Sequence, residues 1–141
     1  MSENTAEIPL SPSSALLRRL AALLYDLILL IAVLFVVTAL ALVPNDGQAI
    51  EHPLYLVVVL GVGWLFFDWF WRHGGQTLGM RAWGLTLVDD GGGALTRRRT
   101  AIRYALGIVL FGFTLLSVPF DARGRAMHDR LTRTRVIRLQ R

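Results

Sequence analysis

The sequence predicts an α-helical integral membrane protein with two transmembrane helices, a third short hydrophobic helix of re-entrant type and a small cytoplasmic two-stranded β element. Three observations predict this class. The chain has 141 residues, 54% of them hydrophobic, and a mean hydropathy of +0.50, whereas soluble domains are about 45–50% apolar. The apolar residues gather in three blocks, and the basic residues lie between and after these blocks. The pattern therefore indicates one membrane domain, residues 15–141, behind a polar leader, residues 1–14, that we expect to be disordered.

The first block, residues 16–43, is long enough to cross a bilayer as a helix. After Arg19 it runs for 24 residues with a single charge, Asp26, and a spanning helix needs roughly 20 apolar residues. A secretory signal peptide is the alternative, because Arg18 and Arg19 precede the apolar run of this block and Ala39-Leu40-Ala41 resembles a cleavage site. We favour the span, since the block exceeds the usual apolar core of a signal peptide and contains an aspartate.

The second block, residues 53–71, predicts a second span, and the arginines around it predict the topology. The loop at residues 44–52 has no Lys or Arg, whereas the segment at residues 72–100 has five Arg. Basic residues mark the cytoplasmic side of a membrane protein. We therefore expect a multi-pass protein of the inner (plasma) membrane, with a cytoplasmic N-terminus and a cytoplasmic segment at residues 72–100.

The third hydrophobic segment, residues 101–120, conflicts with the tail that follows it. A full span would place the basic tail, residues 121–141, outside the cell, although this tail carries seven Arg against two Asp. The positive-inside bias favours a cytoplasmic C-terminus. We therefore prefer a segment that enters the membrane and returns on the same side, and a full span remains the alternative.

Two short alternating runs predict the β element. Residues 84–89 and residues 132–139 both alternate between apolar and polar side chains, and the first run ends in the turn-rich Asp-Asp-Gly-Gly-Gly. A lone strand is marginal, so each needs a partner. If the two pair, both lie on the same side of the membrane; the alternative is a plain loop and a separate frayed tail.

Charged residues within or near the apolar blocks are the first candidates for a site. Arg19 and Asp26 are two helical turns apart on one helix face, with Ala22 between them. Intramembrane aspartates are costly and usually mark ion or proton paths, but Asp26 is equally compatible with a structural pair to Arg19 or to Arg103 from another helix. Asp68 lies four residues before Arg72, and for it we favour such a structural pair.

The tail adds His128 and Asp129, which are adjacent in the sequence. The histidine titrates near neutral pH and could act with the aspartate in a pathway. Alternatively, Asp129 caps a helix or pairs with Arg125 and Arg133, which would lie one turn away on either side. Binding to nucleic acid is not expected, because the basic tail follows a membrane block and has no interleaved aromatic residues. The tail is expected to contact anionic lipid headgroups instead.

Three motifs in order resemble the RDD family of small bacterial membrane proteins, which is named for one Arg and two Asp. They are Arg19-x-x-Ala22-x-x-x-Asp26, the segment GGQTLGMRAWGLTLVDD, and the terminal GRAMHDRLTRTRVI. The resemblance covers roughly residues 16–138 and implies a membrane protein of unassigned ligand, with cation–proton exchange attributed to some members. Met80 departs from the family pattern, which usually has Lys there, and the third hydrophobic region is short. The matching positions outside the first motif are Gly75, Thr77, Gly79, Gly84, Leu85, His128, Asp129, Thr134 and Val136.

Two functions of different class remain open from the sequence. The first is a small transporter that moves a cation or proton past Asp26, and its small size implies a homo-oligomer or a partner membrane protein. The second is a non-catalytic scaffold or regulatory subunit that acts through its Arg-rich cytoplasmic face. We expect no enzyme, cofactor or metal site, because the chain has no Cys, its three His lack ligand spacing and no catalytic triad can be assigned.

Overall fold

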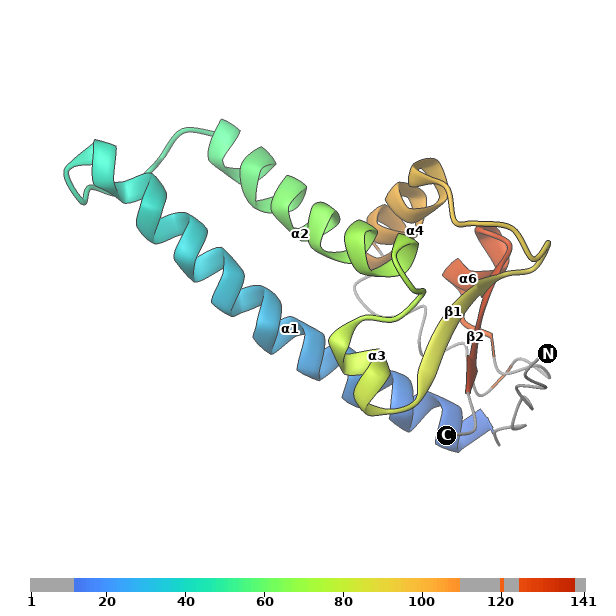
Figure 1. Ribbon diagram of the computed structural model, residues 1–141. Helices are drawn as coiled ribbons and strands as arrows, with labels where there is room; N and C mark the ends of the chain where they lie inside the picture. The colour runs from blue at the N-terminus through green and yellow to red at the C-terminus, as the bar shows by residue number, and fades with distance from the viewer. Residues whose placement is uncertain (1–11, 110–119, 121–124, 139–141) are drawn as a thin grey trace.

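A computed structural model describes residues 12–109, 120 and 125–138 of the chain. Two long helices, α1 (Pro12–Leu42) and α2 (Leu54–Arg72), run side by side and are joined at their far end by the 3-10 turn η1 (Val43–Asn45). The remaining elements gather at the opposite end, around the start of α1 and the end of α2 (Figure 1). They are α3 (Leu78–Ala82), β1 (Leu85–Asp89), α4 (Arg97–Val109), α6 (Met127–Leu131) and β2 (Thr134–Arg138).

The two long helices confirm the predicted spans, with shifted ends. α1 begins at Pro12 instead of residue 16, so residues 12–14 of the expected leader are helical, while residues 1–11 lie outside the described part. Proline fits this position because the first helical turn has no use for its missing N–H. α2 begins at Leu54, directly after Pro53, and ends at Arg72.

Both long helices turn most of their apolar side chains outward. In an 18-residue apolar stretch of the first helix, only 6% is buried inside the molecule, and in the corresponding stretch of the second helix 17% is buried. Leu24, Ile28 and Phe35 of α1 and Leu56 of α2 are more than half exposed. A soluble core helix would bury such side chains, so this surface is of the kind that lipid covers.

The predicted pairing of the two short runs is confirmed. β1 and β2 form an antiparallel two-stranded sheet in which Leu85 lies opposite Arg138 and Asp89 opposite Thr134. Leu85 and Leu87 are buried against Ala22 of α1 and Met80 of α3. This apolar face explains why so short a sheet is ordered: it packs on a helix instead of standing alone.

Two helices begin within residues 72–100, the segment that the sequence predicted as a cytoplasmic loop. α3 follows the Gly-Gly exit of α2, and α4 begins at Arg97, inside the stretch expected to be a cytoplasmic loop. α4 covers the first part of the third hydrophobic segment as far as Val109. The rest of that segment, apart from Phe120, lies outside the described residues, and so the prediction that it is re-entrant concerns residues outside the described part.

Candidate functional site

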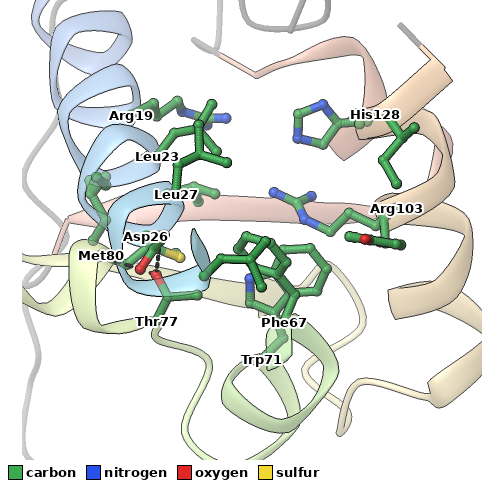
Figure 2. A pocket seen from close by; sticks show the side chains of 17 residues that line it. Arg19, Leu23, Asp26, Leu27, Phe67, Trp71, Thr77, Met80, Arg103 and His128 are labelled. Carbon is green, nitrogen blue, oxygen red and sulfur yellow. Dashed lines mark hydrogen bonds between the residues drawn. The ribbon is translucent and has the colours of Figure 1, made fainter. Parts of the chain in front are cut away.

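A cavity of about 480 Å³ lies between α1, α2, α3 and α4, close to the sheet. Its walls are mostly apolar, with Leu23 and Leu27 of α1 and Phe67 and Trp71 of α2 among them (Figure 2). Small-molecule sites in proteins have this size and this mixture of an apolar lining with few polar groups. The polar residues in the lining are Arg19, Asp26, Thr77, Arg103, Tyr104 and His128.

Asp26 lies in the wall of the cavity and is held by neutral donors from α3. Its Oδ1 accepts a hydrogen bond from the backbone N–H of Gly79 at 2.8 Å, and its Oδ2 accepts one from the Thr77 hydroxyl. The Thr77 oxygen in turn accepts from the Met80 N–H at 3.1 Å and so caps α3. The carboxylate is only 3% exposed and lies at the start of a short helix, where backbone donors favour a negative charge.

Glycine at position 79 is what lets α3 approach Asp26 so closely. A Cβ atom there would overlap the carbonyl oxygen of Ala22 and lie 2.9 Å from the Cγ of Asp26. Ala22 is itself small and 2% exposed. The small side chain of Ala22 therefore lets a neighbouring helix approach closely, and this neighbour is α3 and not a second membrane span.

The two arginines that we considered as partners of Asp26 converge on Asp129 instead. Arg19 donates to Asp129 Oδ2 at 2.5 Å, and Arg103 donates to Asp129 Oδ1. The carboxylate is completely buried, and both arginines are 7% exposed. This ion cluster joins α1, α4 and α6, three elements far apart in the sequence. The alternative in which Asp26 pairs with Arg19 or Arg103 is not realised among the described residues, because the fold brings Asp129 to both guanidinium groups.

Asp129 also caps its own helix. Its Oδ2 accepts the backbone N–H of Ala126, the residue before α6, at 3.2 Å. The expected capping role is thus present. The alternative role of Asp129, in ion pairs with Arg125 and Arg133 one helical turn away, is not seen. Arg125 contacts Asp90 at 3.4 Å, and α6 ends before Arg133. Burial alone would raise the pKa of Asp129, but the charges of Arg103 and Arg19 outweigh it and hold this pKa well below its ordinary value.

His128 is neutral in this environment. Burial, and then the positive charge of Arg103, lowers the pKa of His128 from 6.5 to about 3. Its Nε2 lies 3.4 Å from Asp129 Oδ1. Its Nδ1 is buried and has no hydrogen-bond partner among the described residues. The predicted neighbourhood of His128 and Asp129 is therefore real, with the imidazole in the cavity wall and the carboxylate behind it.

Asp68 is a structural link between α2 and α4. The expected ion pair with Arg72 is present at 3.3 Å, and the Thr100 hydroxyl donates to the other carboxylate oxygen at 2.5 Å. Asp68 is 4% exposed, as buried as Asp26. Within the described part of the chain it is not among the residues that line the cavity, so the structure separates it from Asp26.

Sequence reasoning missed the part played by three buried threonines. Thr77, Thr100 and Thr134 are each 1% exposed and donate or accept hydrogen bonds with the buried charges. Thr77 and Thr134 stand at positions of the resembling motifs, which was the available signal. Thr100 had no signal beyond its place before an apolar run. In the described residues, no group of three His, Asp or Glu side chains could hold a metal ion.

The comparisons with known proteins agree with the motifs. The model of the RDD family matches residues 14–133, which is most of the chain. No curated protein and no solved structure matches. The matched region contains Arg19, Asp26 and Asp129, and it ends just before β2. The chain is a membrane protein that belongs to the RDD family.

Proposed function

We propose that this protein is a membrane transporter that binds a small cation or a proton at Asp26. The observation that carries the proposal is the position of Asp26: it lies in the wall of a cavity, and the hydrogen bonds to its carboxylate come from the neutral donors of Thr77 and Gly79. The two buried arginines nearby contact Asp129. The charge of Asp26 can therefore attract a cation that enters the cavity.

The depth of Asp26 supports this reading. Seven residues separate it from Arg19 along α1, a rise of about 10 Å, so it lies within the apolar part of the helix. A charge at such a depth is expensive, and proteins keep such residues mainly for ion and proton paths. Two spans are too few to enclose a path, so we propose that the working unit is a homo-oligomer or a complex with another membrane protein.

We further propose that both ends of the chain face the cytoplasm of an inner-membrane protein. β2 comes from the C-terminal tail and pairs with β1, which follows α2 and the short helix α3. The two strands must therefore lie at the same end of the membrane helices as the start of α1 (Figure 1). This arrangement supports a third hydrophobic segment that returns to the side it entered, and a basic tail in contact with anionic lipid headgroups.

The alternative is a scaffold or regulatory subunit without transport. The observation that favours it is the exposure of Arg97, Arg98 and Arg133, which could contact an acidic partner at the cytoplasmic end. A scaffold would not need a charged group at Asp26. It would need only the hydrogen bonds by which this residue holds α3. The two functions therefore differ in what they predict for Asp26→Asn.

Ion flux into proteoliposomes tests the proposal. Vesicles that contain the protein and a pH-sensitive dye receive a sodium or potassium gradient, and the rate of the dye signal is measured. We expect flux with the wild type and none with Asp26→Asn, because the amide keeps the shape of the carboxylate but carries no charge. Asp68→Asn is the matched control, since it makes the same change at an equally buried aspartate outside the cavity lining.

Retained fold must be shown for both variants, by gel filtration and tryptophan fluorescence. Folded Asp26→Asn protein with wild-type flux would remove Asp26 from the pathway. Absence of flux in the wild type would favour the scaffold. The same conclusion would follow if both variants lost flux equally and in proportion to their loss of stability.

A further inference from the structure

Three arginines from distant parts of the sequence surround the turn that joins α3 to β1. Arg18 of α1 contacts the carbonyl oxygen of Trp83, the residue that follows α3, at 3.5 Å. Arg81 lies in the last turn of α3, and Arg138, at the end of β2, lies opposite Leu85, where β1 begins. The three arginines and Trp83 define a basic corner of the molecule, to which α1, α3 and β2 contribute.

The Arg138 side chain leaves β2 on the side of the sheet that faces α1. Side chains alternate along a strand, so Arg138 shares a face with Val136. Val136 packs against the buried cluster that contains Ala22 of α1 and Met80 of α3. Figure 1 shows α3 and the start of β1 beside the first half of α1. The three arginines therefore lie around the same turn on the same side of the sheet.

The lengths of the two long helices place the basic corner at the level of the lipid headgroups. α2 has 19 residues and rises about 28 Å, which matches the roughly 30 Å of the hydrocarbon layer. α1 has 31 residues and is joined to α2 at its far end, so its additional residues extend beyond the end of α2. Counted back from Leu42, a stretch as long as α2 reaches Leu24, and Arg18 lies about 9 Å farther along the helix. The headgroup layer is about 5–8 Å thick on each side, and a long arginine side chain reaches into it.

The aspartates of the elements that form the basic corner have other partners. Asp26 of α1 is hydrogen-bonded to neutral donors of α3, and Asp89, at the other end of β1, pairs with Arg99. Within residues 12–109, 120 and 125–138, no ion pair joins a carboxylate to Arg18 or to Arg138. The corner therefore carries an excess of positive charge, which an anionic group would balance.

Exposed apolar side chains accompany this charge. Trp83 is 41% exposed, and Leu78, at the other end of α3, is 40% exposed. The start of α3 contacts Asp26 and so lies closer to the hydrocarbon layer than Trp83 does. Tryptophan is enriched where a membrane meets water, because its ring lies at the level of the headgroups. Guanidinium groups around an exposed indole, with an apolar side chain toward the hydrocarbon, suit a phospholipid better than a soluble anion.

We propose that the basic corner is a binding site for one anionic phospholipid, in which Arg18 and Arg138 contact the phosphate and Trp83 lies beside the glycerol region. A guanidinium group presents its donors in a planar fork that matches the oxygens of a phosphate. The site goes beyond the general contact between the basic tail and the membrane, because it requires that α1, α3 and β2 come together. It does not depend on transport at Asp26.

Lipid binding to the purified full-length protein tests the proposal. The protein in a neutral detergent is titrated with phosphatidylglycerol and, separately, with phosphatidylcholine that has the same acyl chains, and bound lipid is counted by native mass spectrometry. Inorganic phosphate is added as a competitor, so that a lipid site is distinguished from a site for free phosphate. The variants are Arg18→Gln and Arg138→Gln. Arg133→Gln is the matched control, because it removes the same charge from the basic tail near the opposite end of β2.

We expect one molecule of phosphatidylglycerol to bind roughly tenfold more tightly than phosphatidylcholine, or better, and to remain bound in the presence of inorganic phosphate. Arg18→Gln and Arg138→Gln should each weaken binding of phosphatidylglycerol about fivefold, the equivalent of about 1 kcal/mol for each basic residue at an anionic surface. Arg133→Gln should change it little. None of the three variants should change the affinity for phosphatidylcholine.

Fluorescence quenching locates the bound lipid. Phosphatidylglycerol that carries bromine atoms on its acyl chains should quench tryptophan fluorescence in vesicles more strongly than brominated phosphatidylcholine. Trp83→Phe should remove this difference, since it leaves the other three tryptophans in place.

Three results would overturn the lipid site. They are equal affinity for the two lipids, displacement of phosphatidylglycerol by inorganic phosphate, and a loss in Arg133→Gln as large as the losses in the other two variants, which would reveal only general attraction by the tail. If Arg18→Gln does not fold, the comparison of lipids on the wild type and the pair Arg138→Gln and Arg133→Gln still decide. Ion flux enters none of these measurements, so failure of the transport proposal would leave their outcome unchanged.

Discussion

Removal of the Asp129 carboxylate is the most severe single change that the structure predicts outside the cavity lining. In Asp129→Ala, Arg19 and Arg103 lose their shared counter-ion while both remain 7% exposed. Both side chains are almost fully enclosed, so their charges would have little contact with water. The change therefore leaves two like charges buried near each other, which is more costly than breaking a single surface ion pair.

The magnitude follows from burial and from the cap. Removal of one partner from a buried ion pair costs about 3–5 kcal/mol. Loss of the hydrogen bond from Ala126 N–H adds the cost of a helix cap, about 1 kcal/mol. We expect Asp129→Ala to lower the free energy of unfolding by about 4–6 kcal/mol, a large part of the roughly 5–15 kcal/mol of a typical domain.

The assay is unfolding in mixed micelles, followed by tryptophan fluorescence. Asp90→Ala is the matched control, because it removes a carboxylate from the same end of the molecule that contacts Arg125 at 3.4 Å and is 35% exposed. That change should cost no more than about 1 kcal/mol. Asp129→Asn gives a milder version if the alanine variant yields no folded protein. A loss below about 1 kcal/mol in Asp129→Ala, equal to that of the control, would refute the reasoning about the buried cluster.

Three further outcomes are expected. His128 is held neutral, with a pKa of about 3 against 6.5 when unfolded, so stability is complete above pH 6.5 and falls as the pH drops below it, by about 1.4 kcal/mol per unit. The free energy of unfolding at pH 7, 6 and 5 should therefore fall more steeply in the wild type than in His128→Gln, and equal slopes would contradict the burial of this group. Gly79→Ala should lower the free energy of unfolding by about 1–3 kcal/mol, because the added methyl group pushes α3 away from Ala22. Gly92→Ala, at an exposed turn, should not affect the contacts of Asp26. Chemical shifts or crosslinking between α1 and α3 would show whether only the first variant separates these two helices. A reporter active only in the periplasm, fused after Arg141, should be silent, and strong activity would make the third hydrophobic segment a full span.

The two spans were predictable because they depend on local properties of the chain. An apolar run of sufficient length requires a helix in lipid whatever its neighbours are, and α1 and α2 lie within a few residues of the predicted ranges. The strands were predictable for a similar reason, since the alternating pattern of Leu85 and Leu87 defines one buried face. The short helix α3 was not predicted, because five residues are too few to form a stable helix alone. It is stabilised by the Thr77 cap and by contact with α1.

The membrane class, the two spans, the strand pair and the identity of the buried charges follow from local features of the sequence. Which charge contacts which depends on how the elements pack. Arg19 and Asp26 share a face of α1, yet Arg19 pairs with a carboxylate 110 residues away and Asp26 with a hydroxyl and a backbone N–H more than 50 residues away. Spacing along a helix reports only neighbours within a turn or two. The partner of a buried charge depends on which elements pack against that face of the helix. Here the close approach of α3 at Gly79 brings its donors to Asp26, and both arginines pair with Asp129.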